Sequence, residues 1–179
     1  MRIISGKHKG RRLMAPGKLP VRPTTDFAKE ALFNILNNYY HFEEISVLDL
    51  FSGTGNISFE FASRGCLEVV SVDSHHGCIK YIEKIAIELS LEIKTIKSDV
   101  FKFLENTNVS RDVIFADPPY DLSIEQFEKI VYHVFNNSLL KEQGTLIIEH
   151  SKHTKLDHLP NFHMEKRYGG NVFSFFEIP

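Results

Sequence analysis

Residues 47–73, VLDLFSGTGNISFEFASRGCLEVVSVD, contain the pattern that decides the class of fold. An apolar run over 47–51 ends in a glycine-rich turn, residues 57–64 have the spacing of a helix, and 67–73 form a second apolar run. Two apolar strands connected through a helix predict a right-handed βαβ unit, in which the two strands run parallel in one sheet.

The alternation of strand and helix continues toward the C-terminus. We predict helices over 79–89, 100–104 and 127–135 and strands over 93–97, 112–116 and 145–149. Two further extended runs, 162–168 and 172–178, are joined by a tight turn at Gly169-Gly170-Asn171 and must be antiparallel to each other. The expected fold is an α/β, Rossmann-like sheet of seven strands, mostly parallel with one antiparallel strand, with helices on both faces.

The N-terminal region precedes this alternation and has a different composition. Residues 1–25 contain seven basic side chains and no acidic one, whereas the other 154 residues hold 14 basic and 23 acidic groups. Apolar patches on either side of Gly6 and Gly10 predict a basic β-hairpin, and Pro23 followed by Thr and Asp residues predicts a helix over 26–40. A basic arm on an acidic body is typical of phosphate recognition, although a solubilising tail has the same composition.

The bulk composition indicates an ordinary globular chain of 179 residues, which we expect to form a single domain with its core over 45–179. Hydrophobic residues make up 42% and charged residues 25%, enough apolar material for a core without disulfides or bound metal. Cys66 and Cys78 are expected to be reduced thiols, and no Cys or His spacing indicates zinc. No apolar run has the length of a membrane span and no signal peptide is evident, so we expect a cytoplasmic protein.

Ligands on doubly wound sheets bind beyond the carboxyl ends of the strands, so residues that follow each strand are candidate site residues. Gly53 and Gly55 lie in the first turn, where missing side chains let a ligand approach the backbone, but the three-glycine dinucleotide pattern is absent. Asp73, 20 residues after Gly53, is placed to accept hydrogen bonds from the ribose hydroxyls of an adenosine group. Asp99 follows the next strand and is either an acceptor for an adenine amine or a helix cap.

The most specific motif, Asp117-Pro118-Pro119-Tyr120, follows the fourth predicted strand. Two prolines fix the backbone and remove two donors, so a carboxylate and rigid carbonyls remain as acceptors beside an aromatic ring. These groups suit a planar NH₂ group, because holding both hydrogens localises the nitrogen lone pair and stabilises the positive charge that develops during methyl transfer. Stacking of a base on Tyr120 would contribute roughly 1–3 kcal/mol.

Several segments together resemble the RsmD family, bacterial methyltransferases that modify a guanine N2 amine of 16S rRNA in the small ribosomal subunit. The matching segments are Arg2-Ile3-Ile4-Ser5-Gly6, Lys9-Gly10-Arg11-Arg12-Leu13, Arg22-Pro23-Thr24-Thr25-Asp26, Leu32-Phe33-Asn34, residues 49–55, Ser63-Arg64-Gly65, Asp117-Pro118-Pro119-Tyr120 and Tyr168-Gly169, with Glu30, Glu60 and Glu149. The resemblance covers essentially the whole chain. It implies a class I methyltransferase with strand order 3-2-1-4-5-7-6, S-adenosylmethionine as cofactor, 16S rRNA or the small subunit as partner, and a monomer.

The resemblance also implies roles for individual residues. The residues expected to bind the cofactor are Asp49, Phe51, Gly53, Gly55, Asp73, Asp99 and Val100. Those expected to hold the target amine are Asp117, Pro118, Pro119 and Tyr120. Together with the charge pattern it predicts RNA contacts for Lys7, Lys9, Arg11, Arg12, Arg22 and Thr24, with residues 22–25 closing over the cofactor or the base. Asn56 and Ser74-His75-His76 depart from the family pattern, and His150, beside Glu149, is the one scattered histidine that merits inspection.

Other functions share parts of this pattern. N6-adenine methylation of DNA or RNA is the main alternative, because the Asp-Pro-Pro-Tyr motif does not choose between amines. A small chain without a sequence-reading domain is a poor duplex-DNA enzyme. A glutamine-directed protein methyltransferase would usually carry Asn at position 117, and an NAD-dependent oxidoreductase is disfavoured by the missing third glycine. A non-catalytic RNA-binding module would differ by having no methyl transfer for Asp117→Ala to abolish.

Overall fold

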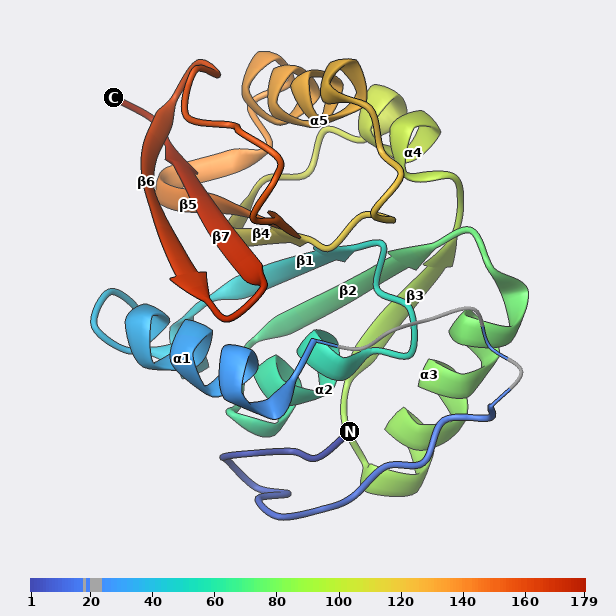
Figure 1. Ribbon diagram of the computed structural model, residues 1–179. Coiled ribbons are helices and arrows are strands. Elements are labelled where there is room, and N and C mark those ends of the chain that lie inside the picture. The colour runs from blue at the N-terminus through green and yellow to red at the C-terminus, as the bar shows by residue number, and fades with distance from the viewer. Residues whose placement is uncertain (18, 20–23) are drawn as a thin grey trace.

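The computed structural model describes residues 1–17, 19 and 24–179, and it contains the expected sheet (Figure 1). The strands are β1 (Ser46–Leu50), β2 (Glu68–Asp73), β3 (Ile93–Lys97), β4 (Arg111–Ala116), β5 (Leu140–Ser151), β6 (Phe162–Tyr168) and β7 (Asn171–Glu177). They form one sheet in the order β3-β2-β1-β4-β5-β7-β6. β7 pairs antiparallel with both β5 and β6, whereas the pairs among β1 to β5 are parallel. The predicted strand order and the single reversed strand are confirmed.

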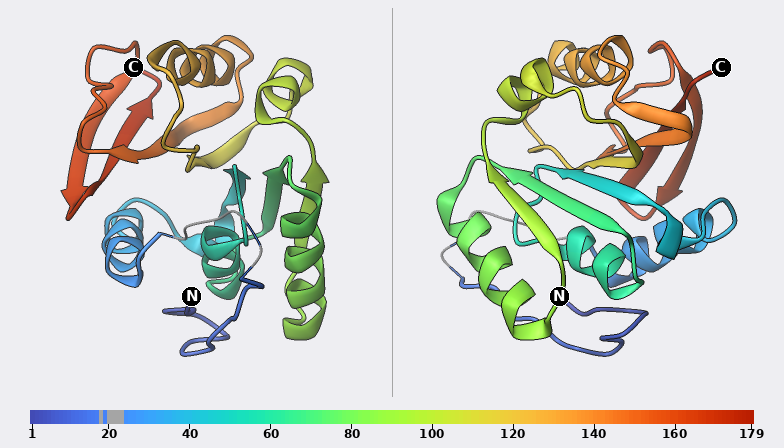
Figure 2. Two further views of the ribbon diagram at one scale, coloured as in Figure 1. Left: turned by 45° about the vertical axis from the view of Figure 1, so that its right-hand side comes forward. Right: turned by 180° about the vertical axis from the view of Figure 1, so that it is seen from behind.

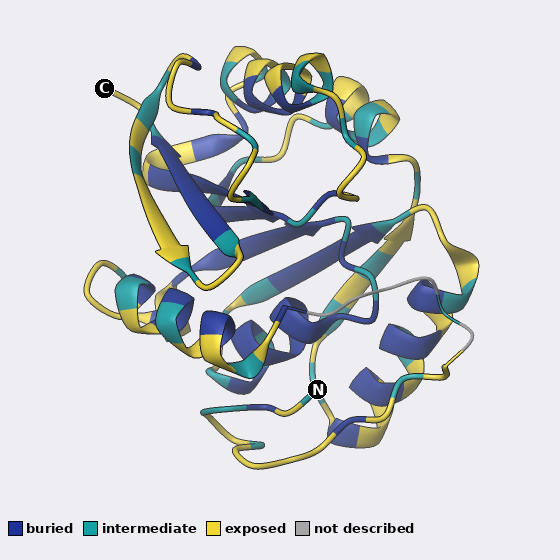
Figure 3. Ribbon diagram, viewed as in Figure 1, coloured by how far each residue is buried: buried dark blue, intermediate teal, exposed yellow. Residues whose placement is uncertain are grey.

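Helices cover both faces of the sheet, as Figures 1 and 2 show from three sides. One layer consists of α1 (Asp26–Leu36), α2 (Asn56–Ser63) and α3 (His76–Leu89), and the other of α4 (Val100–Asn106) and α5 (Ile124–Asn136). A short 3-10 helix, Phe42–Glu44, leads into β1. Burial follows from this layering, because the central strands and α2 are buried along their length, while the other helices expose one side (Figure 3).

Alternate residues of the central strands face the two layers of helices. Leu48 and Val70 pack in the core beneath α4 and α5, whereas Val47 and Val69 pack in the core beneath α1 and α2. All four side chains are buried, and each contributes roughly 1.5–3 kcal/mol through removal of apolar surface from water. The need to fill both cores explains the unbroken apolar runs in the sequence.

The N-terminal helix is shorter than predicted. It begins as expected, because the Thr25 hydroxyl accepts a hydrogen bond from the Ala28 N–H and caps α1. It ends at Leu36 rather than at residue 40, since two asparagines follow and asparagine favours turns over helix. Tyr39, which the predicted helix would have included, lies beyond its end and is 63% exposed.

The N-terminal arm, residues 1–17, is docked and doubles back on itself, so the predicted hairpin is present in a short form. An antiparallel bridge joins Arg2 to Arg12, and backbone hydrogen bonds connect residues 1–3 with residues 10–13. Ile3 and Leu13 are buried against α2 and α3. Gly6 has a φ of +80°, and a Cβ at this position would lie 1.8 Å from the backbone oxygen of Ser63. The short hairpin is therefore held on the body of the protein by side-chain burial and by close contact with α2.

The fifth strand, β5, spans Leu140–Ser151 and is therefore longer than the strand predicted over 145–149. Its register against β4 shifts between Arg111 and Val113, and this irregularity accommodates the polar residues 141–144. No helix in the part of the chain that the structure describes combines the length and the apolar character needed to cross a bilayer.

Candidate active site

The turns after the central parallel strands enclose a cleft of about 470 Å³, within the usual size range of ligand pockets. The residues that line it are Thr24, Asp49, Phe51, Ser52, Gly53, Thr54, Asn56, Ile57, Asp73, Ser74, His75, Cys78, Asp99, Val100, Phe115, Asp117, Pro118, Pro119 and Tyr120. The cleft thus brings together the residues predicted to bind the cofactor, apart from Gly55, with those predicted to hold the amine. Local sequence could not show this meeting, because the segments come from four separate strand ends.

Asp49 lies at the base of the cleft and is 1% exposed. Its carboxylate accepts hydrogen bonds from the Ser58 backbone N–H, at 3.1 Å, and from the Ser58 hydroxyl. The Ser58 hydroxyl contacts Ser71 at 2.6 Å. Burial nevertheless raises the pKa of Asp49 to about 7, because the two donors only partly offset the loss of water.

The glycine-rich turn after β1 has a strained backbone. Phe51 has a φ of 57°, a left-handed conformation that is unusual for a bulky side chain. Gly55 has a φ of +77° at the N-cap of α2, and a Cβ there would lie 2.9 Å from Ile82 Cγ1. Gly55 does not line the cleft, so the structure gives it a packing role in which α2 approaches α3 closely.

Asp73 and Asp99 both combine a structural contact with a position on the cleft wall. Asp73 accepts hydrogen bonds from the Gly53 N–H at 2.8 Å and from the His75 N–H at 2.7 Å, which leaves one lone pair on each oxygen. Asp99 caps α4 by accepting from the Lys102 N–H at 3.0 Å. The helix-cap interpretation of Asp99 is therefore correct, and its second oxygen is available to a ligand.

The Asp117-Pro118-Pro119-Tyr120 motif leaves β4 at the mouth of the cleft. The Asp117 N–H donates to the Leu50 carbonyl at 3.4 Å, which holds the ends of β4 and β1 together. The Pro119 carbonyl accepts from the Leu122 N–H at 3.1 Å, whereas no donor of the described chain meets the Pro118 carbonyl. One rigid carbonyl is therefore free to accept, and the 63% exposed Tyr120 ring lies beside it.

Three carboxyl groups influence one another in and beside this cleft. Burial raises the pKa of Asp117 well above its usual value, and the negative charges of Glu149 and Asp49 raise it further. Burial also raises the pKa of Glu149, against the effect of two hydrogen-bond donors. These are the Thr24 hydroxyl at 2.7 Å and the Asn171 side chain at 2.6 Å. A cation bound near these three acids would stabilise their ionised forms and lower their pKa values.

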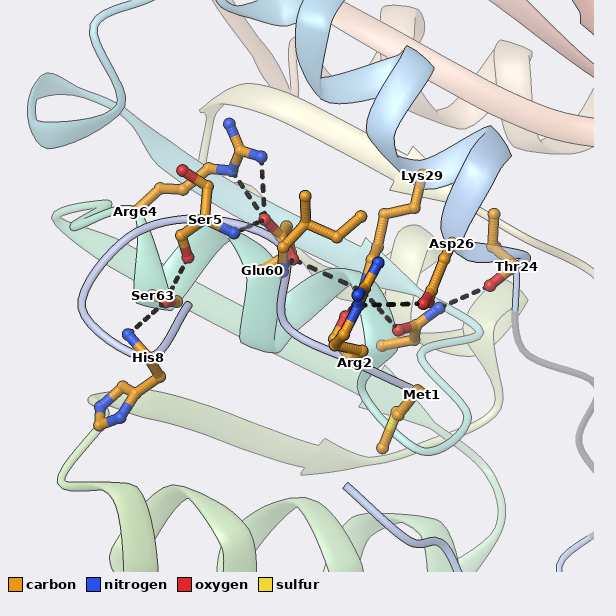
Figure 4. Close-up of polar contacts among 12 residues, drawn as sticks. Met1, Arg2, Ser5, His8, Thr24, Asp26, Lys29, Glu60, Ser63 and Arg64 are labelled. Atoms are coloured by element: carbon orange, nitrogen blue, oxygen red, sulfur yellow. Dashed lines mark hydrogen bonds and ion pairs between the residues drawn. The ribbon is translucent and has the colours of Figure 1, made fainter. Parts of the chain in front are cut away.

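A buried polar network connects the arm to this cleft (Figure 4). Glu60 is fully buried and accepts from the Ile4 N–H at 2.8 Å and the Ser5 N–H at 3.0 Å. Lys29, 1% exposed, lies 3.5 Å from Glu60 and donates to the Asn56 side chain at 2.9 Å. Burial lowers the pKa of Lys29, and the charge of Glu60 counteracts this effect.

Asn56 has a specific role in that network. Its amide nitrogen donates to the Thr24 carbonyl at 2.9 Å while its oxygen accepts from Lys29. A small residue at this position could make neither bond, so the departure from the family pattern has a structural function. The sequence did not indicate the pairing of Lys29 with Glu60, because isolated charged residues on amphipathic helices are normally solvated.

The predicted RNA-binding residues are separated in space. Thr24 lies in the cleft wall, whereas Lys7, Lys9, Arg11 and Arg12 are exposed on the arm. The Lys7 N–H donates to the backbone oxygen of Ser63, and Arg11 pairs with Glu88 at 2.6 Å, so the arm cations lie near the far ends of α2 and α3. Arg22 lies outside the described residues.

His150 is structural. Its Nδ1 lies 2.9 Å from the Ser151 carbonyl oxygen and its Nε2 lies 2.8 Å from the Ser174 hydroxyl. A carbonyl only accepts, so Nδ1 carries the proton and Nε2 accepts from Ser174 in the neutral ring. Burial lowers the pKa of His150, which favours this neutral form.

The residues of the cleft fit S-adenosylmethionine. The Ser52 hydroxyl is buried in its wall without a partner in the described chain, as expected of a group that a ligand satisfies. Asp73 and Asp99 have lone pairs without a donor in the described chain, which suit hydroxyl and amino donors, and Asp49 and Asp117 line the same cleft as carboxyl groups whose ionised forms a sulfonium cation would stabilise. The strand order and this cleft define a class I, S-adenosylmethionine-dependent methyltransferase.

Comparison with known proteins gives the family. The model of a family described as conserved hypothetical protein 95 matches residues 1–177, and the chain belongs to this family, the RsmD family. It is similar to ribosomal RNA small subunit methyltransferase D of Buchnera aphidicola (subsp. Baizongia pistaciae), with 31% identity over 83% of this chain and 75% of that protein.

Solved structures agree with the fold. A hypothetical protein from Thermus thermophilus superposes with a TM-score of 0.86 and 25% identity over 99% of both chains. The 16S rRNA N2 G1207 methyltransferase RsmC of Thermus thermophilus, solved with AdoMet and guanosine, has a TM-score of 0.71 and 20% identity over 90% of this chain and 45% of that one. The latter likeness concerns the fold alone.

Proposed function

We propose that this chain transfers the methyl group of S-adenosylmethionine to the exocyclic N2 amine of a guanine in 16S rRNA of the small ribosomal subunit. The observation that carries the proposal is the position of the Asp117 carboxyl and the Pro118 carbonyl, which meets no donor among the described residues, at the mouth of the cleft that contains Asp49 and Asp73. The relative named ribosomal RNA small subunit methyltransferase D supports the choice of rRNA. We also propose that the chain acts as a cytoplasmic monomer.

The residues of the cleft would bind and orient both partners. Asp73 and Asp99, whose other lone pairs accept from backbone N–H groups, would hold the ribose hydroxyls and the adenine amine of the cofactor, respectively. The bound cofactor supplies an electrophilic methyl group on a sulfonium. Asp117 and the Pro118 carbonyl accept the two amine hydrogens, which localises the nitrogen lone pair and aligns it with the methyl group. The raised pKa of Asp117 suits it to receive the proton that the amine loses after transfer.

The proposed substrate is tested by product analysis. The protein is incubated with isotope-labelled S-adenosylmethionine and small subunits from cells that lack this gene, and the rRNA is digested to nucleosides. Labelled N2-methylguanosine is the expected product, and N6-methyladenosine would refute the choice of amine. Asp117→Ala should abolish labelling of the rRNA while leaving the affinity for rRNA nearly unchanged. A non-catalytic RNA-binding module would show no labelling even with the wild-type protein.

A further inference from the structure

An exposed aromatic and basic surface lies around the turn between β6 and β7, which we name the hairpin rim. It consists of Phe27, Tyr168, Lys152 and Arg167. Phe27 on α1 is 68% exposed, and its ring meets Tyr168 edge-on with 6.1 Å between ring centroids. A single exposed ring is ordinary on a protein surface, but the two adjoining rings form a contiguous aromatic patch rimmed by polar residues, which is the kind of surface that partners bind.

Two basic residues lie at the same turn. The backbone N–H of Lys152 donates to the Gly170 carbonyl at 3.2 Å, and the Arg167 side chain donates through Nε to the Gly169 carbonyl at 3.3 Å. Both side chains belong to exposed residues. Residues 152–168 contain four Lys or Arg and two acids, although the chain after residue 25 is acidic overall. The hairpin rim is therefore a local positive region on an acidic body.

The hairpin rim is continuous with the wall of the cleft. Asn171, the next residue after the turn, donates to Glu149, and the other oxygen of Glu149 accepts from Thr24. Thr24 lines the cleft, and Phe27 follows it by three residues at the start of α1. In Figure 1 the turn between β6 and β7 lies beside the N-terminal half of α1.

The arm is less well placed to hold RNA near the target base. α3 begins at the cleft, and Arg11 pairs with Glu88 close to the other end of this helix. Fourteen residues of helix span about 20 Å, so the arm cations can reach only phosphates several nucleotides away. Figure 1 shows the arm below α2 and α3, away from the hairpin rim.

On the basis of the proposed function, we infer that the hairpin rim binds the single-stranded RNA that flanks the target nucleotide. A methyltransferase needs its base out of the stack, and the neighbouring bases then offer faces to aromatic side chains and phosphates to cations. Phe27 and Tyr168 stack against a flanking base, while Lys152 and Arg167 contact its phosphates.

The test measures affinity for fluorescently labelled 16S rRNA at several salt concentrations, with methyl transfer assayed in parallel. Phe27→Ala should weaken binding about fivefold or more, the loss expected for one stacked base. Lys152→Ala combined with Arg167→Ala should reduce the slope of log affinity against log salt by about 1.4, the value for two contacts to a single strand. Affinity for S-adenosylmethionine should remain unchanged in all rim variants.

Matched controls come from the opposite layer of helices. Tyr132 on α5 is 60% exposed, so Tyr132→Ala controls for loss of an exposed ring. Lys129→Ala removes an exposed cation of the same helix. Rim variants that bind rRNA like these controls would overturn the inference.

Two further outcomes separate the possible failures. Weakened binding of Phe27→Ala to assembled subunits but not to extracted rRNA would mean that the hairpin rim contacts ribosomal protein, and the inference would be wrong. If the wild type methylates no rRNA while the rim variants still lose rRNA affinity, the proposed function fails and the RNA surface stands.

Discussion

Replacing Asp49 with asparagine should flatten the pH dependence of stability. Burial raises the pKa of Asp49 from 3.8 to about 7, so its protonated form is favoured in the folded state. Between pH 4 and 7 the unfolded chain loses this proton while the folded chain keeps it, and the free energy of unfolding therefore falls as pH rises. A shift of this size corresponds to about 4 kcal/mol in total.

Asp49→Asn keeps an oxygen that can accept from both Ser58 donors but cannot ionise. Urea unfolding of wild type and variant at pH 4.5, 6 and 8 isolates the contribution of this one group, although other raised carboxyls act in the same direction. The stability of the wild type minus that of the variant should decrease by roughly 3–4 kcal/mol over this range. Parallel stability curves would refute the reasoning.

Glu68, the first residue of β2, offers a control in which stability depends on pH in the opposite direction. The hydrogen bond from Lys94 lowers the pKa of Glu68. Its contribution to stability is therefore present at high pH and lost on acidification, so Glu68→Gln should change the curve in the reverse direction.

Three further predictions concern the arm, the proposed role of Asp117 in catalysis and the buried ion pair. Gly6→Ala should release the arm to proteases because its Cβ would meet the α2 backbone, whereas Gly10→Ala, with a similar φ of +85° but open space around it, should not. The rate of methyl transfer should rise with pH through the raised pKa of Asp117, and this dependence should disappear from the residual activity of Asp117→Asn; a retained dependence would assign it to another group. Lys29→Met should lower the free energy of unfolding, measured in urea, by about 3 kcal/mol, because Glu60 loses a buried partner. In a Glu60→Gln background the same substitution should lower the free energy of unfolding by less.

The docked arm and the cleft are parts of one hydrogen-bonded unit. Glu60 holds the arm backbone, Lys29 joins Glu60 to Asn56, and Asn56 joins Lys29 to the Thr24 carbonyl in the cleft wall. Loss of the arm would leave buried polar groups without partners next to the cleft. A truncation of the arm is therefore expected to affect cofactor affinity as well as RNA affinity.

The order of helices and strands, the reversed strand and the position of the site could be predicted from the sequence. Apolar periodicity records which face of each element is buried, and Gly169-Gly170 requires a tight antiparallel connection. The Asp-Pro-Pro-Tyr motif carries its chemistry within four adjacent residues, so no knowledge of distant contacts is needed to recognise it. The same holds for the aspartates that follow β2 and β3, because strand ends share one edge of a parallel sheet.

Other features depended on contacts between residues far apart in the chain. The hydrogen bond from Thr24 to Glu149 spans 125 positions, and the pairing of Lys29 with Glu60 depends on how α1 and α2 pack. The Pro119 carbonyl accepts a hydrogen bond from the Leu122 N–H, and is therefore not available to a ligand, because of the path of one turn. Local patterns record burial and backbone preference, whereas pairing across the fold is decided when packing brings side chains within hydrogen-bond distance. For this reason the chemistry could be read from short motifs, and the network that supports it only from the tertiary structure.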